Sequence, residues 1–523
     1  MALMGLDLGT SGCKSVVYTA DGKYLSGAYR EYTASRTSGI HELDANVMWD
    51  CIREVIAVGA KDCITATGGR ERVEAVIVTS FGEAGVPVDE NGNVLHGIVL
   101  YTDNRGAKET EDLCRSAGSG DILRGKKVIE DAVYMKPHSM YTLPKIMWYR
   151  NTLPDVYARM WKFFLIEDYA VWRLSGECKV SYSCAARSLA FDVVNKRWSE
   201  TVLRAAGIPV SLFSDPVPSG TPAGCVLPSL CAELNLSPDT LIVNGAHDQI
   251  SAAVGAGALT PGTSVDGMGT VECITPVFDR PLADPMLINR GYVSAPHAID
   301  GLYATNAFTY CGGALIQWFR DTVGKDAKLL AAQKDTSAYR LLDAEISDDV
   351  CAKSPTGILV MPHFAGAATP YMDTDTHGAV IGLSLETTRA QFYKAMMEGV
   401  TYEMLLNIEM LKTGGMNIGQ LNAAGGGARS EVWMQLKADI TGLPVHTLEN
   451  PEAGAVGCIM LGAVAKGYYR DLHEASRALV RTKKTFQPDA ENHARYAEHY
   501  EKYKRIYDAV KTVYGSVNPY KES

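Results

Sequence analysis

Hydrophobic positions follow two different patterns along this chain. Residues 3–8, 73–79 and 241–245 are short, mostly apolar runs that end at glycine or polar residues, which is typical of buried strands. Residues 47–60 and 161–174 repeat apolar side chains at every third or fourth position, so we expect helices there. Buried strands that alternate with amphipathic helices predict an α/β fold.

Two stretches share the order strand, Gly-Thr turn, strand. Residues 3–18 turn at Gly9-Thr10-Ser11-Gly12, and residues 263–274 turn at Gly269-Thr270. This recurrence predicts a duplicated architecture, in which each half begins with a β-hairpin whose tip faces a shared central cleft. We place the domains at residues 1–246 and 247–523, since 523 residues suffice for two separate cores.

Three further segments have clear patterns. Residues 250–258 predict a helix rich in small residues, which permits close packing, and residues 378–398 predict a tight turn, an apolar strand, a short loop and an amphipathic helix. Residues 491–514 carry tyrosines and aliphatic residues at helical spacing with charges between them, which predicts a docking helix.

Composition narrows the class of protein. The formal net charge of -10 argues against nucleic acid or an anionic membrane as the main partner. No apolar run is long enough to predict a membrane span, and the N-terminus lacks the basic start of a signal peptide. The 12 cysteines are scattered without a C-x-x-C pair, so we expect buried free thiols in a reducing compartment, the cytoplasm.

Three glycine-rich turns are candidates for binding phosphate groups. Two are the hairpin tips, where backbone N–H groups, the hydroxyls of Thr10 and Ser11 and the charge of Lys14 supply donors. The third is Gly425–Ser430, which follows an apolar strand and precedes a helix. Each alone is more often an ordinary turn, and none matches a P-loop or a G-x-G-x-x-G fingerprint. Their presence together favours a nucleotide site.

Two aspartates adjoin these turns. Asp7 precedes the first tip and is a candidate Mg²⁺ ligand; the ordinary alternative is that it caps its own turn. Asp248 follows a buried strand at the start of a predicted helix. It is a candidate general base for a substrate hydroxyl that attacks a phosphate, and the ordinary alternative is a helix N-cap.

The segment 378–398 fills every position of the C-terminal pattern of the FGGY carbohydrate kinases, and the chain resembles that family over almost its whole length. The xylulose kinase, or pentulose kinase, branch is the most similar. The other segments that carry the resemblance are the Asp-x-Gly-Thr-Ser hairpin at 7–11, Tyr101-Thr-Asp103-Asn-Arg105, and residues 140–148, 183–192, 313–318 and 425–430.

The resemblance implies two actin-like ATPase (ribonuclease H-like) domains with a central cleft, and ATP and Mg²⁺ as cofactors. It implies transfer of the γ-phosphate to a hydroxyl of a ketose or polyol, with a xylulose-like sugar as the leading candidate. In the family pattern Asp248 is the catalytic base, and Gly269 and Thr270 contact phosphate. The positions that line the nucleotide are Gly313, Gln317, Gly426, Gly427 and Ser430.

The substrate end of the chain departs from each branch of the family. Residues 80–85 read Ser-Phe-Gly-Glu-Ala-Gly, where xylulose kinases carry Gln-Met-His-Gly and glycerol kinases an Arg-Glu pair. Gln249 follows the base, where xylulose kinases usually have Asn. Our candidate substrate contacts are Glu83, Asp103, Arg105, Asp248 and Gln249, with His41 and Glu42 nearby. For Asp103 and Arg105 the alternative is an ion pair that fixes a surface loop.

Two other classes of protein share this architecture. One is a sugar-binding regulatory homologue without transfer, and the other is an actin- or chaperone-like ATPase that drives contacts with a protein partner. The complete pattern at 378–398 and the Asp248-Gln249 pair favour the kinase. We expect a small-molecule sugar or polyol as the partner, and a homodimer is an open alternative to a monomer.

Overall fold

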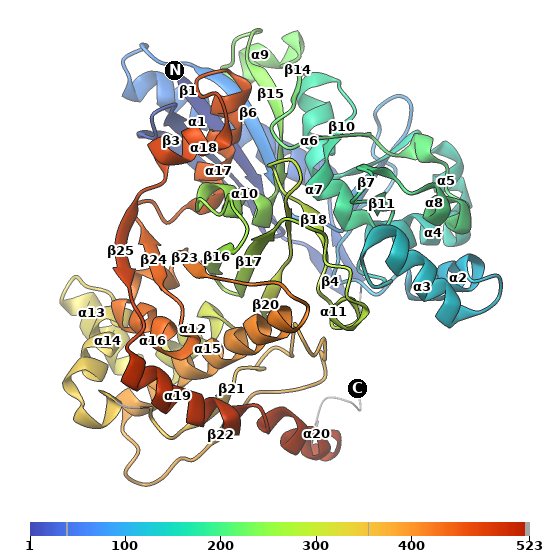
Figure 1. Cartoon of the computed structure of the whole chain (residues 1–523). Helices are drawn as coiled ribbons and strands as arrows, with labels where there is room; N and C mark the ends of the chain where they lie inside the picture. The colour runs from blue at the N-terminus through green and yellow to red at the C-terminus, as the bar shows by residue number, and fades with distance from the viewer. Residues whose placement is uncertain (38–39, 354, 518–523) are drawn as a thin grey trace.

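The computed structural model describes residues 1–37, 40–353 and 355–517, and it contains two large mixed sheets (Figure 1). In the first sheet, β1 pairs antiparallel with β2 and parallel with β6. The strands of this sheet, in spatial order, are β14 (Pro222–Cys225), β15 (Leu241–His247), β6 (Val73–Ser80), β1 (Ala2–Leu8), β2 (Gly12–Thr19) and β3 (Tyr24–Glu31).

The second sheet repeats the arrangement of the first. Its β16 pairs antiparallel with β17 and parallel with β23, as β1 pairs with β2 and β6. The strands, in spatial order, are β18 (Ala295–Pro296), β19 (Tyr303–Ala304), β17 (Glu272–Phe278), β16 (Thr263–Met268), β23 (Gln420–Ala424), β24 (Val445–Leu448) and β25 (Thr482–Phe486), with β20 (Ala307–Thr309) also on β17. The predicted duplication is confirmed by this shared strand order.

Helices and short sheets surround the two large sheets. One short sheet has three strands, with β5 (Ile40–Leu43) between β4 (Ser35–Thr37) and β8 (Ile98–Val99). The other short sheets are pairs: β7 (Gly85–Val88) with β9 (Lys162–Leu165), β10 (Lys179–Ser181) with β13 (Asp215–Val217), β11 (Phe191–Asp192) with β12 (Arg197–Trp198), and β21 (Leu359–Met361) with β22 (Ala379–Ile381). The longer helices are α1 (Ala45–Ala66), α2 (Ala107–Ala117), α3 (Ile122–Val133), α4 (Thr142–Thr152), α6 (Ile166–Ser175), α10 (Asp248–Gly255), α12 (Gly313–Thr322), α13 (Lys325–Gln333), α14 (Ala338–Asp348), α15 (Arg389–Thr413), α16 (Glu431–Thr441), α17 (Ala453–Ala465), α18 (Leu472–Leu479), α19 (Ala490–Tyr503) and α20 (Ile506–Val517).

Two helices, α10 and α17, lie between the two sheets and cross at very short range (Figure 1). A Cβ atom added at Gly255 of α10 would lie 1.8 Å from the carbonyl oxygen of Ala453, and one added at Gly457 of α17 would lie 1.9 Å from that of Ser251. The Ser251 hydroxyl also donates to the carbonyl of Gly454 at 3.0 Å. The small residues expected in this helix therefore let two backbones touch.

The second half of the chain also contributes to the first domain. Although it follows the second sheet in sequence, α17 packs on β1, β6 and β15. A Cβ atom added at Gly5 of β1 would lie 2.9 Å from Cβ of Cys458, which shows how closely this helix approaches the strand. The boundary between residues 246 and 247 stays a prediction.

Two predicted helices differ from the structure. The predicted helix at 161–174 begins with the strand β9, because Lys162–Leu165 pairs antiparallel with Gly85–Val88; only α6 is helical. The predicted helix at 491–514 is two helices, α19 and α20, which separate at Lys504. Docking itself is confirmed, since Tyr496 and Tyr500 are buried.

The docked helix is fastened by tyrosine hydroxyls. The hydroxyl of Tyr496 donates to Glu398 at 3.1 Å, and that of Tyr500 donates to Glu409 at 2.7 Å, both on α15. Each hydroxyl donates to a carboxylate at the interface, and Glu398 also accepts the hydroxyl of Thr356 at 2.7 Å. Within the described ranges, no helix is both long and apolar enough to cross a membrane.

The helix crossing yields a stability prediction. We expect Gly457→Ala to lower the free energy of unfolding by about 2 kcal/mol or more, because the new methyl group meets the backbone of α10 and the two helices must separate. Gly454→Ala on the same helix is the matched control, because its added Cβ would meet nothing within 4 Å. We expect this variant to keep the free energy of unfolding or to raise it by up to about 1 kcal/mol. Urea denaturation measures both; equal effects would contradict the backbone contact.

Candidate active site

Asp248 lies where the first sheet ends and α10 begins. The strand β15 carries the chain to His247, which is the N-cap of α10, and Asp248 is the first residue of the helix. The Asp248 carboxylate accepts the N–H of Gln249 at 2.6 Å, and 38% of the side chain remains exposed. The predicted base is therefore a first-turn residue rather than the cap, and its carboxylate is accessible to a ligand.

The electrostatic surroundings of Asp248 make it a weak acid. Burial raises the pKa of Asp248 to about 7, and the charge of Glu83 adds to the increase, while the N–H of Gln249 and the charge of Arg187 oppose it. Burial and the charge of Arg187 lower the pKa of neighbouring His247 to about 4, so this imidazole is neutral at pH 7. A carboxylate with a pKa near neutrality is well suited to accept a proton from an alcohol.

Arg187 is a site residue that the sequence did not single out. It lies in a short 3₁₀ turn (Ala186–Ser188), and its Nε donates to Oε1 of Glu83 at 2.5 Å, with both side chains less than a tenth exposed. Its Nη1 is buried and has no acceptor among the described residues. A buried donor without a partner is unfavourable, so Nη1 is a candidate to donate to an oxygen of a substrate. The sequence signal was its place in the family-like segment 183–192.

Glu83 has a strained backbone beside this ion pair. Its φ is 67°, in the left-handed region that favours glycine. The preceding Gly82 has no room for a side chain, since an added Cβ would lie 2.8 Å from Cβ of Arg187. Burial raises the pKa of the Tyr101 hydroxyl, and the charges of Glu83 and Asp248 add to the increase, so Tyr101 shares the electrostatic surroundings of these carboxylates. The structure thus brings Glu83, Tyr101, Arg187 and Asp248 together.

Asp7 lies near Asp248 at the end of β1. Burial raises the pKa of Asp7 to about 7, the charge of Asp248 raises it further, and Lys14 opposes both. Within the described ranges, no hydrogen bond to the Asp7 carboxylate occurs, and no group of three or more His, Cys, Asp or Glu side chains is placed to hold a metal. The Asp7 and Asp248 carboxylates repel each other, and a cation bound near them would relieve this repulsion. Asp7 therefore suits a Mg²⁺ whose other ligands are mostly water or phosphate oxygens.

Lys14 has a partner in the other half of the chain. It lies opposite Asp7 in the β1–β2 register, and its Nζ is 2.5 Å from Oε2 of Glu452, the residue before α17. The predicted role in binding nucleotide therefore competes with an ion pair. Since both side chains are more than a third exposed, this pair is weak and a phosphate can displace it.

The second hairpin tip is held by the start of α12. The N–H of Gly313 donates to the carbonyl of Gly269 at 2.9 Å, and that of Ala314 donates to the carbonyl of Thr270 at 3.0 Å. Because the peptide unit is planar and trans, the N–H groups of Thr270 and Val271 point the opposite way, away from α12. The tip is exposed, so these donors are free to meet a phosphate. Gly313 is required here, since its Cβ would lie 2.5 Å from the Gly269 carbonyl oxygen.

The first hairpin tip is arranged in a similar way. The Tyr32 hydroxyl donates to the carbonyl of Gly9 at 2.5 Å, and the N–H of Tyr32 donates to the carbonyl of Ser11 at 3.2 Å. The hydroxyls of Thr10 and Ser11 have no partner among the described residues. In both tips, carbonyl groups accept hydrogen bonds from the rest of the protein. The hydroxyls of the first tip and the N–H groups of the second are therefore available to donate to a ligand.

The third glycine turn borders the second tip. Gly425 has a φ of 86°, and its Cβ would lie 2.8 Å from the carbonyl oxygen of Met268, just before the tip. Gly426 faces open space, and Ser430 caps α16 by accepting the N–H of Trp433. Gln317, on α12, is exposed. The predicted nucleotide residues 313, 317, 426, 427 and 430 thus lie on elements that contact the tip directly or through one neighbour.

Two candidate substrate residues, Asp103 and Arg105, are paired with each other, and their contact with a substrate stays a prediction. The Asp103 carboxylate is fully buried and accepts Nε of Arg105 at 2.9 Å and the N–H of His41 at 2.7 Å. Arg105 also pairs with Glu42, which is the kind of ion pair that the alternative interpretation requires. The Gln249 side chain accepts a hydrogen bond from the hydroxyl of Thr275 on β17 at 3.5 Å, which joins α10 to the second sheet beside Asp248.

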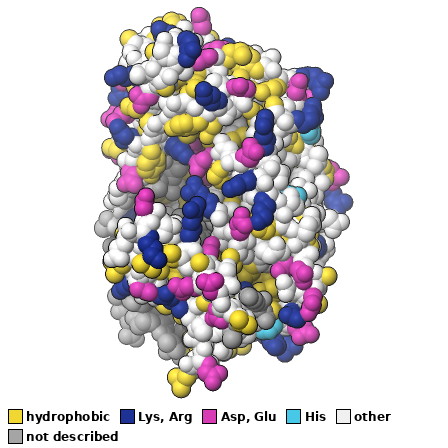
Figure 2. Space-filling model, turned by 90° about the vertical axis from the view of Figure 1, so that its left-hand side faces the viewer, with side chains coloured by type: hydrophobic (Ala, Val, Ile, Leu, Met, Phe, Trp, Pro, Cys, Tyr) yellow, Lys and Arg dark blue, Asp and Glu magenta, His cyan; other side chains and the backbone are white. Residues whose placement is uncertain are grey.

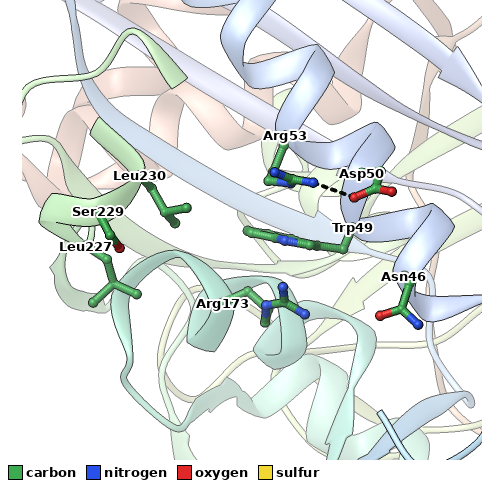
Figure 3. Close-up of a pocket in the computed structure, with 8 residues that line it drawn as sticks. All are labelled: Asn46, Trp49, Asp50, Arg53, Arg173, Leu227, Ser229 and Leu230. Atoms are coloured by element: carbon green, nitrogen blue, oxygen red, sulfur yellow. Dashed lines mark hydrogen bonds and ion pairs between the residues drawn. The ribbon is translucent and has the colours of Figure 1, made fainter. Parts of the chain in front are cut away.

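A cavity of about 380 Å³ lies away from these residues (Figure 3). Figure 3 shows the Trp49 ring of α1 between the guanidinium groups of Arg53 and Arg173; that of Arg173 lies 4.4 Å from the ring centroid. Arg53 pairs with Asp50 at 2.5 Å. The cavity shares no residue with the site around Asp248, so its size alone does not locate the chemistry.

Fold and site define a two-domain α/β protein with acidic side chains at the junction of its domains. Residues 2–255 match the model of the N-terminal domain of the FGGY family of carbohydrate kinases, and residues 268–466 match that of its C-terminal domain. The chain therefore belongs to the FGGY family of carbohydrate kinases, which are ATP-dependent phosphotransferases. It is an enzyme of that class.

Individual relatives are distant but cover nearly the whole chain. The xylulose kinase of Bacillus subtilis (strain 168) is 25% identical over 498 residues, 94% of each chain. The autoinducer-2 kinase of Salmonella typhimurium is 27% identical over 509 residues, 94% of this chain and 92% of its own. The crystal structure of ligand-bound xylulose kinase from Lactobacillus acidophilus matches with a TM-score of 0.85 at 21% identity, over 98% of this chain and 99% of its own.

The buried ion pair gives a second stability prediction. We expect Glu83→Ala to lower the free energy of unfolding by about 3–5 kcal/mol, because it leaves the guanidinium of Arg187 buried without a carboxylate. The double variant Glu83→Ala/Arg187→Met should recover much of this loss, since no unpaired charge remains. Asp112→Asn, which breaks the exposed pair with Lys108, is the control and should change stability by less than about 0.5 kcal/mol. Denaturant titration that found all three variants alike would refute the buried pairing.

Proposed function

We propose that this kinase transfers the γ-phosphate of ATP to a hydroxyl of a ketose or polyol, with Asp248 as the catalytic base. The single observation that supports this most is the Asp248 carboxylate, which is accessible, has a pKa near neutrality and lies where the two sheets are joined. General bases act best when their pKa is close to the working pH.

The residues around Asp248 divide the work. Asp248 accepts or orients the proton of the attacking hydroxyl, while Nη1 of Arg187 and the hydroxyl of Tyr101 donate to other oxygens of the sugar. Thr10, Ser11 and the N–H groups at the Gly269-Thr270 tip bind phosphate oxygens, and this neutralises charge without covalent chemistry. Asp7 holds Mg²⁺, which supplies further neutralisation of the phosphates when bound.

A xylulose-like ketose is the leading substrate. Relatives named xylulose kinase and autoinducer-2 kinase match to nearly the same extent, so identity alone does not choose between them. The site itself is not that of any one branch, since Glu83 stands in the segment that follows β6 and is already paired with Arg187. Rates with a panel of pentuloses, hexuloses, aldonates and polyols would assign the substrate.

Other predicted properties accompany the proposal. On the face drawn in Figure 2, acidic and basic side chains are interspersed, which favours a small-molecule partner over nucleic acid. Buried cysteines such as Cys13 and Cys458 are free, which suits a reducing compartment such as the cytoplasm. A homodimer stays a prediction.

Removal of the base tests the proposal directly. We expect Asp248→Ala to lower kcat for the best sugar by about 10²–10⁴-fold, because the hydroxyl loses its proton acceptor, while the affinity for ATP stays within about threefold. Coupled ADP-release assays measure kcat, and calorimetry measures ATP binding. Near-normal turnover of the Asp248→Ala variant would show that Asp248 is not the catalytic base. Hydrolysis of ATP without sugar would instead favour the actin-like ATPase alternative.

The pH profile tests the same residue independently. Asp248 acts as a base only when it is ionised, and burial raises its pKa to about 7, so kcat/KM should rise with pH and level off above about pH 8. Asp7 titrates in the same range, which makes the acid limb steeper. Asp7→Asn should make that limb shallower without abolishing it. A flat profile between about pH 5 and 8 would show that no carboxylate here controls the reaction.

A further inference from the structure

Three charged side chains are buried together beneath the β16–β17 hairpin. Nζ of Lys437 on α16 lies 2.8 Å from Oδ2 of Asp266 and 2.5 Å from Oε1 of Glu272. Each side chain is at most 1% exposed. The proposed mechanism uses none of the three. Burial of charged groups carries a large desolvation penalty, so we asked what this cluster contributes to the protein.

The strand register explains why the lysine is needed. In the hairpin, Glu272 lies opposite Met268, so Asp266 is its diagonal neighbour on the same face. When both carboxyl groups are ionised, they repel each other across this diagonal. The ammonium group of Lys437 contacts both, and it therefore ties β16 to β17 close to the tip.

The cluster also contacts the other elements around the tip. Lys437 belongs to α16, which begins directly after the glycine turn that ends at Ser430. Glu272 packs against Gly312, where an added Cβ would lie 2.7 Å from Cβ of the glutamate. Gly312 precedes α12, whose first N–H groups hold the carbonyls of Gly269 and Thr270. One lysine thus joins the hairpin to the helix after the glycine turn, and Glu272 joins both to α12.

We propose that Lys437 is a positioning residue for the nucleotide: by clamping Asp266 and Glu272, it fixes the Gly269-Thr270 tip so that the tip's N–H groups meet the phosphates of ATP. The proposal rests on the proposed function, since it takes this tip to be a phosphate site. Lys437 itself is buried and acts through the hairpin, without touching the nucleotide.

The charge state of the cluster also influences the tip. With both carboxylates ionised the cluster has one excess negative charge two residues from Thr270, close to where an anion binds. Burial raises the pKa of Glu272 and the charge of Asp266 adds to the increase, while Lys437 opposes it, so Glu272 keeps its proton to a higher pH than an exposed glutamate does. Asp266 from β16 and Lys437 from α16 are the charged groups that face Glu272; β20 and α12 present the uncharged Thr309 and Gly312.

Steady-state rates with varied ATP and saturating sugar test the clamp. We expect Lys437→Met to raise KM for ATP by about tenfold or more while KM for the sugar changes by less than about twofold, since only the tip is displaced. The triple variant Asp266→Asn/Glu272→Gln/Lys437→Met removes all three charges and should fold more readily, yet keep the raised KM for ATP. Glu431→Gln, which breaks the exposed pair of α16 with Lys484, is the control and should leave both constants unchanged.

A folded triple variant with an unchanged KM for ATP would overturn the proposal, because the hairpin would then hold its shape without the clamp. Failure of the function itself looks different: the wild-type chain would show no sugar-dependent turnover at all.

Glu272→Gln tests the charge without removing the Asp266–Lys437 pair. In the wild type, KM for ATP should rise by about fivefold or more between about pH 7 and 9, as Glu272 loses its proton beside the phosphate site. In the variant this rise should be absent, since an amide cannot ionise. The same rise in both proteins would show that Glu272 does not act on the tip, whereas a merely structural cluster would change stability and leave this pH profile in place.

Discussion

Backbone contact between α10 and α17 is the constraint on which the site depends. Gly255 and Gly457 let the helices touch, and Ser251 adds a hydrogen bond across the crossing. Because α10 begins with Asp248, the position of the proposed base is set by the packing of a helix against another helix rather than by a loop. The same crossing lies between the two sheets, so a movement of one domain relative to the other would act on the contact between these helices (Figure 1).

Burial of charge is the second theme of the molecule. Desolvation is the largest cause of the raised pKa values of Asp7 and Asp248, and it acts on Glu272 as well. Asp7 and Glu272 adjoin the two hairpin tips, and the charge of Asp248 acts on Asp7. Acidic groups that are poised near neutrality respond strongly to the arrival of a cation or a polar substrate, because a bound opposite charge restores the ionised form. The site is therefore prepared electrostatically before any ligand binds.

Much of the fold could be read from local patterns. The two Gly-Thr hairpins predicted the duplication, and the apolar runs at 73–79 and 241–245 are β6 and β15. The segment 161–174 misled because β9 is only four residues long and its aromatic residues also fit a helical spacing. The site was partly predictable for the same reason: Asp7 and Asp248 adjoin strand ends, whereas Arg187 lies in an irregular turn that no periodicity marks.

The sequence by itself determined the elements, the glycine turns and membership of the FGGY kinases, because these depend on residues close together in the chain. The tertiary structure alone decided which charges are paired. Arg187 meets Glu83 across 104 positions, and Lys437 meets Glu272 across 165. Partner and pKa of a buried charge depend on distance and on exclusion of water, and neither is encoded in local spacing.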